Sequence, residues 1–165
     1  MTAIQLCLII SMGAADGSVP LYHHRVSIAC KVAPVVIKHA SANGIDPLVA
    51  VGLIYAESGW KPDAVSRAKA CGLTQVIGRY VGKTCAQLKR PETAIEEGMR
   101  ILAYWKTYTK RRKSRRLKSH LAEALTCYNA GYACSKYPRS RAYAHKVLKT
   151  ASRYRKILSK LIAKK

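Results

Sequence analysis

Acidic side chains are scarce in this chain of 165 residues, which carries eight Asp and Glu against thirty Lys and Arg. The ten glycines show no recurring period, which excludes a collagen-like or repeat architecture. The hydrophobic fraction of 49% excludes general disorder, since disordered chains lack the apolar residues that form a core. The length therefore predicts one folded domain.

Metal-binding patterns are also missing. No two cysteines are separated by just two residues, and the five histidines do not follow metal-ligand spacing. A structural zinc site is therefore disfavoured, and we expect neither a metal nor a cofactor. The six cysteines instead favour disulfides formed in an oxidising compartment. We expect Cys71 to pair with Cys85, and Cys127 with Cys134, because each pair closes a short loop; buried free thiols are the alternative.

The apolar segment Ala3–Ala15 is too short to cross a bilayer, which takes about 20 residues. It resembles a secretory signal peptide, with small residues at its end. We therefore predict a signal peptide over residues 1–15 and a folded domain over residues 20–160. A short buried first helix is the alternative interpretation. Removal of the segment would take Cys7 with it and leave one of the other five cysteines unpaired.

Positive charge is unevenly distributed along the chain. Residues 1–60 carry three basic and three acidic side chains, so the whole net charge of +22 lies in residues 61–165. Such an excess favours anionic partners, among them nucleic-acid phosphates, anionic lipids and acidic cell-wall polymers. We expect the run Lys110–Lys118 to form an exposed basic loop or a fraying helix end, and the C-terminal helix of the domain to be basic as well.

Apolar residues recur at helical spacing through most of the chain, and no alternating strand pattern persists. One predicted helix is nearly all apolar, which indicates burial on all sides. Asp46 and Pro47 mark its start, as cap and first residue, and it ends near Glu57. The fold class is therefore predicted to be all-α, with short helices around this buried one. Further helices are expected at residues 25–42, with a kink or break near Pro34, from about residue 72, and at residues 91–108, 120–128 and 141–161.

Glu57 is the carboxylate for which the neighbouring sequence suggests no capping, turn or surface role. It ends the most apolar helix and begins a polar loop, whereas Glu96, Glu97 and Glu123 are expected on solvated helix faces. Burial at such a position raises the pKa of a carboxyl above its usual value of about 4.3. A general acid that holds its proton near neutral pH needs that environment. Glu57 is therefore the candidate catalytic acid, and a structural carboxylate is the alternative.

The sequence that begins at Glu57 contains two short motifs. Residues 57–66 read ESGWKPDAVS and residues 72–75 read GLTQ. These motifs resemble the signature of the soluble lytic transglycosylases, E-S-x-aromatic-x-P-x-A-x-S followed by G-L-M-Q. Three more blocks follow in the family's order, at residues 91–102, at residues 127–131 (CYNAG, for the family's A-Y-N-A-G) and at residues 141–148. The resemblance thus covers roughly residues 44–150.

The resemblance implies an α-helical, lysozyme-like domain that acts on peptidoglycan, with Glu57 as its single catalytic acid and base. The residues that it implies in substrate binding are Ser66, Gln75, Tyr128, Asn129 and Tyr143. A turn, cap, surface or core role is the alternative for each of these, and Trp60 is expected to pack rather than to stack on a sugar. Two positions depart from the family's pattern. Thr74 replaces a Met, which changes an apolar sugar contact, and Cys127 replaces an Ala.

The resemblance also implies a reaction. Glu57 protonates the oxygen between N-acetylmuramic acid and N-acetylglucosamine and then takes a proton from the C6 hydroxyl, which closes a 1,6-anhydro ring. A muramidase-type hydrolase on the same fold is one alternative, because it differs only in letting water attack. A basic nucleic-acid-binding or virion structural protein is the other, although the chain has no recognised motif for reading nucleic acid.

Partners and location follow from these expectations. We expect peptidoglycan strands as substrate, anionic envelope polymers on the basic surface, no specific nucleic acid and a monomer. The expected location is the periplasm or cell envelope. Envelope remodelling, assembly of a secretion machine, and phage entry or lysis, with a phage-encoded chain, stay open as settings.

Overall fold

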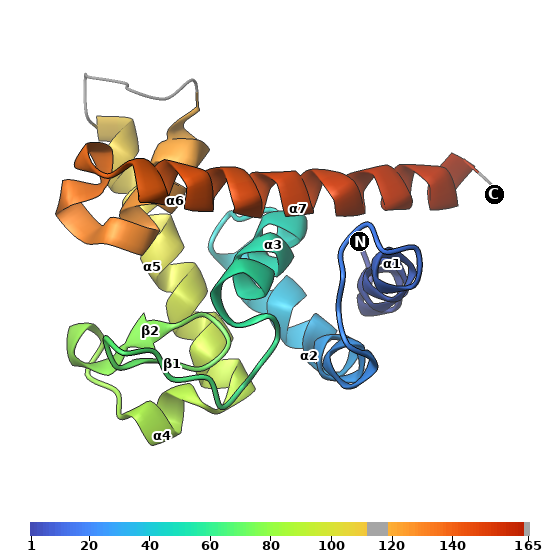
Figure 1. Ribbon diagram of the computed structural model, residues 1–165, viewed down its shortest axis with the longest axis horizontal. Coiled ribbons are helices and arrows are strands. Elements are labelled where there is room, and N and C mark those ends of the chain that lie inside the picture. The colour runs from blue at the N-terminus through green and yellow to red at the C-terminus, as the bar shows by residue number, and fades with distance from the viewer. Residues whose placement is uncertain (112–118, 164–165) are drawn as a thin grey trace.

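The computed structural model describes residues 1–111 and 119–163, whose elements are arranged as Figure 1 shows. Helices dominate, which confirms the predicted all-α fold class. The helices are α1 (Ala3–Ala15), α2 (His23–Ala42), α3 (Pro47–Ser58), α4 (Cys85–Leu88), α5 (Pro91–Arg111), α6 (His120–Ala130) and α7 (Pro138–Ala163), with helical turns η1 (Gly78–Tyr80) and η2 (Gly131–Lys136) and strands β1 (Ala70–Cys71) and β2 (Val76–Ile77). None of the described helices is long and apolar enough to cross a membrane.

Helix α3 is the buried helix that the sequence predicts. The carboxylate of Asp46 accepts a hydrogen bond of 2.8 Å from the backbone N–H of Leu48, and Pro47 occupies the first helical position. The seven residues 48–54 are all buried, so the helix has no solvent-facing side over two turns. Gly59 ends it in the left-handed conformation, with a φ of 55°, as helix-ending glycines commonly do.

Helix α7 crosses α3 closely and extends beyond it (Figure 1). A Cβ placed on Gly52 would lie 2.5 Å from the carbonyl oxygen of Val147, so the crossing requires glycine at that position. Arg155 of α7 also pairs with the capping carboxylate of Asp46. The contact between the two helices fixes the first half of α7, including Tyr143, relative to the end of α3.

The segment between α3 and α5 forms a small β-hairpin rather than the helix expected from about residue 72. Strands β1 and β2 pair in antiparallel register, with Ala70 opposite Ile77 and Cys71 opposite Val76. Each strand has only two residues, which is too short to show an alternating pattern in the sequence. Turns and the short helices η1 and α4 complete this lobe, which lies beside the lower part of α5 in Figure 1.

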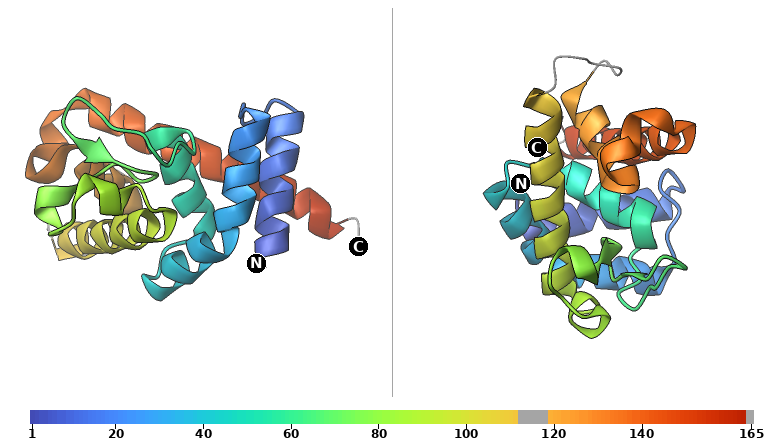
Figure 2. Two further views of the ribbon diagram at one scale, coloured as in Figure 1. Left: turned by 90° about the horizontal axis from the view of Figure 1, so that it is seen from below. Right: turned by 90° about the vertical axis from the view of Figure 1, so that its left-hand side faces the viewer.

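Helices α1 and α2 lie side by side at the opposite end of the molecule (Figure 2). Leu6, Ile9 and Ile10 of α1 are fully buried, and a disulfide joins Cys7 to Cys30 of α2. The segment Ala3–Ala15 is therefore a helix with a buried face, as the alternative interpretation of the sequence predicts. Whether residues 1–15 are removed as a signal peptide stays a prediction.

Helix α2 runs to Ala42 as one helix with Pro34 inside it, and it bends partway along its length (Figure 2). The structure thus has the kink rather than the break of the expectation, as a proline inside a helix favours. The expectation for Glu97 was wrong, because its side chain is buried on α5 rather than solvated, and it pairs with Arg100 one turn further along the helix. The run Lys110–Lys118 lies outside the described residues from position 112 onward, and its first two residues belong to α5.

Candidate active site

Glu57 lies in the last turn of α3, where it lines a cleft of about 910 Å³. The loop after α3 and the β-hairpin form one wall of the cleft, and helices α5 and α6 with the turn η2 form the other. Five of the six site residues predicted from the sequence line this cleft, namely Glu57, Ser66, Gln75, Tyr128 and Asn129. Tyr143 reaches the same place through a hydrogen bond to Glu57.

The carboxyl of Glu57 is held in an environment that favours its protonated form. Burial raises its pKa from the usual 4.5 to about 7, against two weaker opposing effects. The hydroxyl of Tyr143 donates a 2.7 Å hydrogen bond to Oε1 of Glu57, and the positive charge of Lys146 lies nearby; both favour the carboxylate. A group with this pKa can give up a proton and take it back near neutral pH.

Two tyrosine side chains, those of Tyr128 and Tyr143, lie near Glu57. The hydroxyl of Tyr128 donates a 2.8 Å hydrogen bond to the backbone carbonyl of Thr74, which joins α6 to the turn of the hairpin. Burial, with the nearby Glu57 as a second cause, raises the pKa of both Tyr128 and Tyr143 well above the usual value. Both hydroxyls therefore keep their protons and act as donors.

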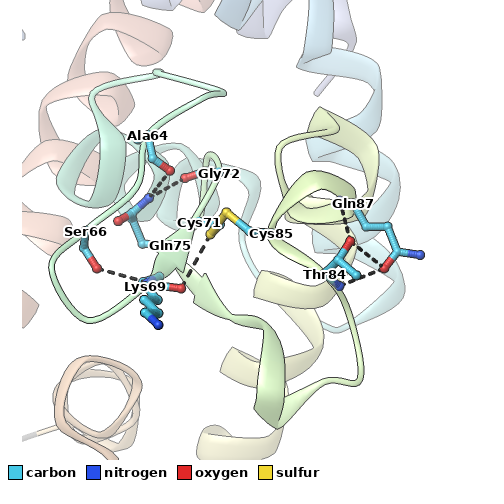
Figure 3. Close-up of a disulfide and its surroundings, with 10 residues drawn as sticks. Ala64, Ser66, Lys69, Cys71, Gly72, Gln75, Thr84, Cys85 and Gln87 are labelled. Atoms are coloured by element: carbon cyan, nitrogen blue, oxygen red, sulfur yellow. Dashed lines mark hydrogen bonds between the residues drawn. A yellow bond between two sulfur atoms is a disulfide. The ribbon is translucent and has the colours of Figure 1, made fainter.

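Ser66 and Gln75 lie on the hairpin side of the cleft (Figure 3). The hydroxyl of Ser66 accepts a 3.0 Å hydrogen bond from the N–H of Ala70, which closes the turn before β1. The side-chain nitrogen of Gln75 donates to the carbonyls of Ala64 and Gly72, at 3.1 and 2.9 Å. Because these bonds use the amide nitrogen, Gln75 offers its carbonyl oxygen, an acceptor, to a ligand in the cleft.

Position 74, where the sequence departs from the family's pattern, faces the protein interior and not the cleft. Thr74 is fully buried, and its hydroxyl donates a 2.5 Å hydrogen bond to the carbonyl of Ala94 in α5. A Cβ on Gly98 would lie 2.6 Å from the Thr74 side chain, so the pair lets the turn sit directly on α5. Trp60 is fully buried and outside the cleft lining, in agreement with a packing role.

Five further aromatic or charged residues, which the sequence did not indicate as site residues, line the cleft. Tyr80, Arg100, Tyr104, Trp105 and Tyr132 all line the cleft. Tyr104 and Tyr108 have the four-residue spacing that places two side chains on one face of a helix. This spacing could have indicated an aromatic face on α5, but the apolar residues of the same helix gave the stronger pattern. Tyr132 lies 28 residues further along, and no local pattern connects it to α5.

Carboxylates other than Glu57 stay away from the cleft. The described residues include all eight Asp and Glu of the chain, and of these only Glu57 lines it. Asp46 caps α3, and Glu97 is paired with Arg100. Within the described ranges no three His, Cys, Asp or Glu side chains come together as a metal site would need. The chemistry that this cleft can offer is therefore proton transfer by a single carboxyl group.

The part of the chain that forms the cleft matches a known protein family. The model of the family described as "Transglycosylase SLT domain" matches residues 34–150, which is more than half of the chain. The chain belongs to this family. The match contains α3, the hairpin and the whole of α5, so it includes Glu57 and both walls of the cleft.

Individual relatives carry related names. The membrane-bound lytic murein transglycosylase C of Haemophilus influenzae (strain PittEE) is 36% identical over 73 residues, which is 44% of this chain and 20% of the relative. The protein of the same name from Histophilus somni (strain 2336) is 33% identical over 72 residues, 43% of this chain and 20% of the relative. The match thus spans about a fifth of the length of these curated relatives.

Solved structures share the fold. An inactive variant of the lytic transglycosylase Slt from Pseudomonas aeruginosa superposes with a TM-score of 0.63 at 19% identity, covering 86% of this chain and 25% of that one. The 70 kDa soluble lytic transglycosylase from Escherichia coli gives a TM-score of 0.63 at 20% identity, covering 94% of this chain and 30% of that one. These matches confirm the lysozyme-like fold that the sequence predicts.

Proposed function

We propose that this chain is a lytic transglycosylase, which cleaves the β-1,4 bond between N-acetylmuramic acid and N-acetylglucosamine in peptidoglycan. The family supports the substrate class. The observation that carries the proposal is that Glu57, with its pKa raised to about 7, is the only carboxylate among the described residues that lines the cleft. That arrangement suits an acid that later acts as a base.

The first step is protonation of the leaving oxygen. Glu57 in its neutral form donates its proton to the glycosidic oxygen as the bond from that oxygen to C1 of the muramic acid breaks. The carbonyl of the neighbouring N-acetyl group stabilises the positive charge that develops on the sugar. The proton reaches the N-acetylglucosamine hydroxyl, so Glu57 is left as a carboxylate that the Tyr143 hydroxyl and the charge of Lys146 stabilise.

The second step closes the ring. The C6 hydroxyl of the same muramic acid forms a bond to C1, and Glu57 takes the proton that this oxygen loses. The enzyme returns to its starting state, and the product is a 1,6-anhydromuramic end. Glycoside hydrolysis commonly uses two carboxylates that flank the bond. The cleft offers one, so the internal hydroxyl fits this site better than a water that would need a second base.

Substrate binding falls to the polar residues around Glu57. We assign to Gln75 the acceptance of a hydrogen bond from the sugar through its amide oxygen, since its nitrogen is held by Ala64 and Gly72. Ser66 lies beside it in the cleft lining, and Asn129 lies exposed on the opposite rim. Tyr143 acts on Glu57 rather than on the sugar. The reaction uses no metal or cofactor.

The same proposal places the chain at the cell envelope, in the periplasm or beyond it, where its substrate is found. Helix α7 carries no Asp or Glu, and its exposed basic side chains face solvent along its length. Such a surface attracts anionic envelope polymers and raises the local concentration of the enzyme on them. We expect the chain to act as a monomer without a specific nucleic-acid partner.

Digestion of purified peptidoglycan tests the proposal. The wild-type protein should release soluble muropeptides, and Glu57→Gln should lose nearly all of this activity while keeping the wild-type circular dichroism spectrum. Glu96→Gln is the matched control, since it removes an exposed carboxyl of α5. Normal release by Glu57→Gln would rule out Glu57 as the acid.

A further inference from the structure

The hairpin lobe, residues 61–90, has a small hydrophobic core of its own. Strands β1 and β2 have two residues each, and the buried members of this core are Cys71, Val76 and Leu88. Ile101 of α5 packs against the cluster from outside the lobe. A segment of fewer than about 40 residues rarely stays folded on so small a core without a crosslink, a metal or a partner. The lobe therefore depends on a further constraint.

Positive charge opposes the compact form of the hairpin lobe. Its only acidic residue is Asp63, against seven Lys and Arg. Like charges held within one small unit repel one another, and this repulsion destabilises the compact state. The basic residues are Lys61, Arg67, Lys69, Arg79, Lys83, Lys89 and Arg90.

One disulfide crosslinks the two halves of the lobe. The bond between Cys71 and Cys85 joins β1 to the first residue of α4 across a separation of 14 residues (Figure 3). A crosslink over a loop of this length shifts the equilibrium between ordered and disordered chain about a hundredfold toward the ordered form. Because Cys71 is also one of the three buried core residues, the same bond fills the core and closes it.

The turn of the hairpin is anchored independently of this disulfide. Leu73 is fully buried in the main core, and the hydroxyl of Thr74 donates to the carbonyl of Ala94 in α5. The chain beyond this turn contributes four cleft-lining residues, namely Val76, Ile77, Tyr80 and Val81. Loss of the crosslink therefore releases the part of the cleft wall between β2 and α4, whereas Glu57 stays in place at the end of α3.

The two sulfur atoms differ in their access to solvent. Cys71 is 1% exposed, whereas Cys85 is half-buried. An external thiolate can therefore attack the Cys85 sulfur, which forms a mixed disulfide and releases Cys71 as a thiolate. A second external thiol then attacks the external sulfur of the mixed disulfide and releases Cys85. In sum, the pair gains two electrons and two protons, and two external thiols become one disulfide.

We propose that the Cys71–Cys85 bond is a redox switch for strand binding. When the bond is formed, it holds the outer part of the cleft wall in place, and when it is reduced, that wall is released and the enzyme is latent. Thiols stay reduced in the cytosol, so activation requires an oxidising compartment, where exchange with an external disulfide forms the bond. The switch rests on the proposed function for the ligand that it controls.

Digestion of peptidoglycan before and after reduction tests the switch. Treatment of the wild-type protein with dithiothreitol should raise KM about tenfold, because apparent affinity falls with the fraction of molecules in which the lobe is ordered. The value of kcat should change little, since Glu57 keeps its position. Removal of the reductant and addition of glutathione disulfide should restore the original KM.

Paired substitutions assign the effect to one bond. Cys71→Ser with Cys85→Ser should show the raised KM with and without reductant. Cys7→Ser with Cys30→Ser is the matched control, because that disulfide joins α1 to α2 outside the cleft lining, and this variant should still respond to the reductant. Circular dichroism checks the fold of each variant, and the reversible change in the wild-type protein decides if a variant fails to fold.

The third disulfide provides a second control on the other wall of the cleft. Cys127 and Cys134 join the end of α6 to η2. A variant with both of these residues changed to Ser keeps the Cys71–Cys85 bond, so its KM should still rise on reduction. A loss of the response in this variant would place the switch in the α6 wall and overturn the proposal.

Limited trypsin digestion reports on the lobe without the chemistry. Arg79 and Lys83 lie between β2 and α4, in the part of the wall that reduction should release. Reduction should therefore accelerate cleavage after these two residues more than cleavage within α7. Mass spectrometry of the early fragments identifies the sites.

The possible results distinguish the switch from the proposed function. An unchanged KM in protein whose Cys71 and Cys85 are shown by labelling to be free thiols overturns the switch. Wild-type KM in the Cys71→Ser and Cys85→Ser variant overturns it as well. Reduction-dependent cleavage after Arg79 in a protein that digests no peptidoglycan would support release of the wall and remove the proposed function instead.

Discussion

The hydroxyl of Tyr143 donates a 2.7 Å hydrogen bond to Oε1 of Glu57, which joins the beginning of α7 to the end of α3. This bond favours the carboxylate, whereas burial favours the neutral acid, and burial is the larger effect. The pKa of Glu57 therefore depends on a balance that single substitutions can shift in a known direction.

Removing the Tyr143 hydroxyl should move the pH profile. In Tyr143→Phe the carboxylate of Glu57 loses a donor, so the pKa of Glu57 rises above about 7. The first step needs the neutral acid, so the pH at which kcat/KM falls should shift upward in this variant. Tyr137→Phe, on an exposed tyrosine before α7, is the matched control. An unshifted profile would show that Tyr143 does not act on Glu57.

Glu57 should lower the stability of the folded protein above neutral pH. Its pKa is about 7 when folded and near 4.5 when unfolded, so the folded state binds more protons between these values. Stability is therefore full below pH 4.5 and decreases as pH rises through 7, by about 3 kcal/mol for this group. Glu57→Gln should unfold at higher urea than wild type at pH 8, and the difference should shrink at pH 5. An equal difference at both pH values would contradict the assigned burial cost.

The Cys7–Cys30 disulfide predicts the behaviour of the first helix. Its 23-residue separation leads us to expect that replacing both cysteines by Ser lowers the free energy of unfolding by about 3 kcal/mol. Protein isolated from its native compartment should also show no thiol that reacts under non-reducing conditions. A mature chain that starts after residue 15, with a single labelled thiol at Cys30, would instead support the signal-peptide interpretation.

The basic side chains of α7 should affect docking more than chemistry. Lys149, Arg153 and Lys156 are exposed, and changing all three to Gln should weaken binding to whole cell walls more than cleavage of short soluble glycans. The control removes the same charge elsewhere, at Lys31, Lys89 and Arg90. Equal losses on both substrates would contradict this separation. Nucleic-acid binding that survives high salt would favour the nucleic-acid alternative.

Local signals account for what could be predicted from the sequence. The cap at Asp46, the proline after it and an unbroken apolar run define α3, and they isolate Glu57 at its end. Helix periodicity likewise indicates α5 and α7, although α5 extends to Arg111 and α7 begins earlier, at Pro138. Each of these features depends on neighbours within a few residues.

Long-range contacts account for what could not be predicted. Thr74 turns into the protein because Gly98 of α5 leaves room for it, and no pattern near residue 74 shows this. Glu97 is buried only because α5 meets the rest of the fold on that face. The hydroxyls of Tyr104 and Tyr132 are hydrogen-bonded to each other, although the sequence separates the two residues by 28 positions. Tertiary packing decides all three.

Cleavage of peptidoglycan in heavy-oxygen water tests the central claim most directly. If Glu57 moves one proton out and back while the C6 hydroxyl closes the ring, the new muramic ends are lighter by one water than hydrolysed ends and carry no heavy oxygen. Mass spectrometry of the released muropeptides distinguishes the two. Reducing muramic ends that carry the heavy isotope would contradict the account and identify a hydrolase on this fold.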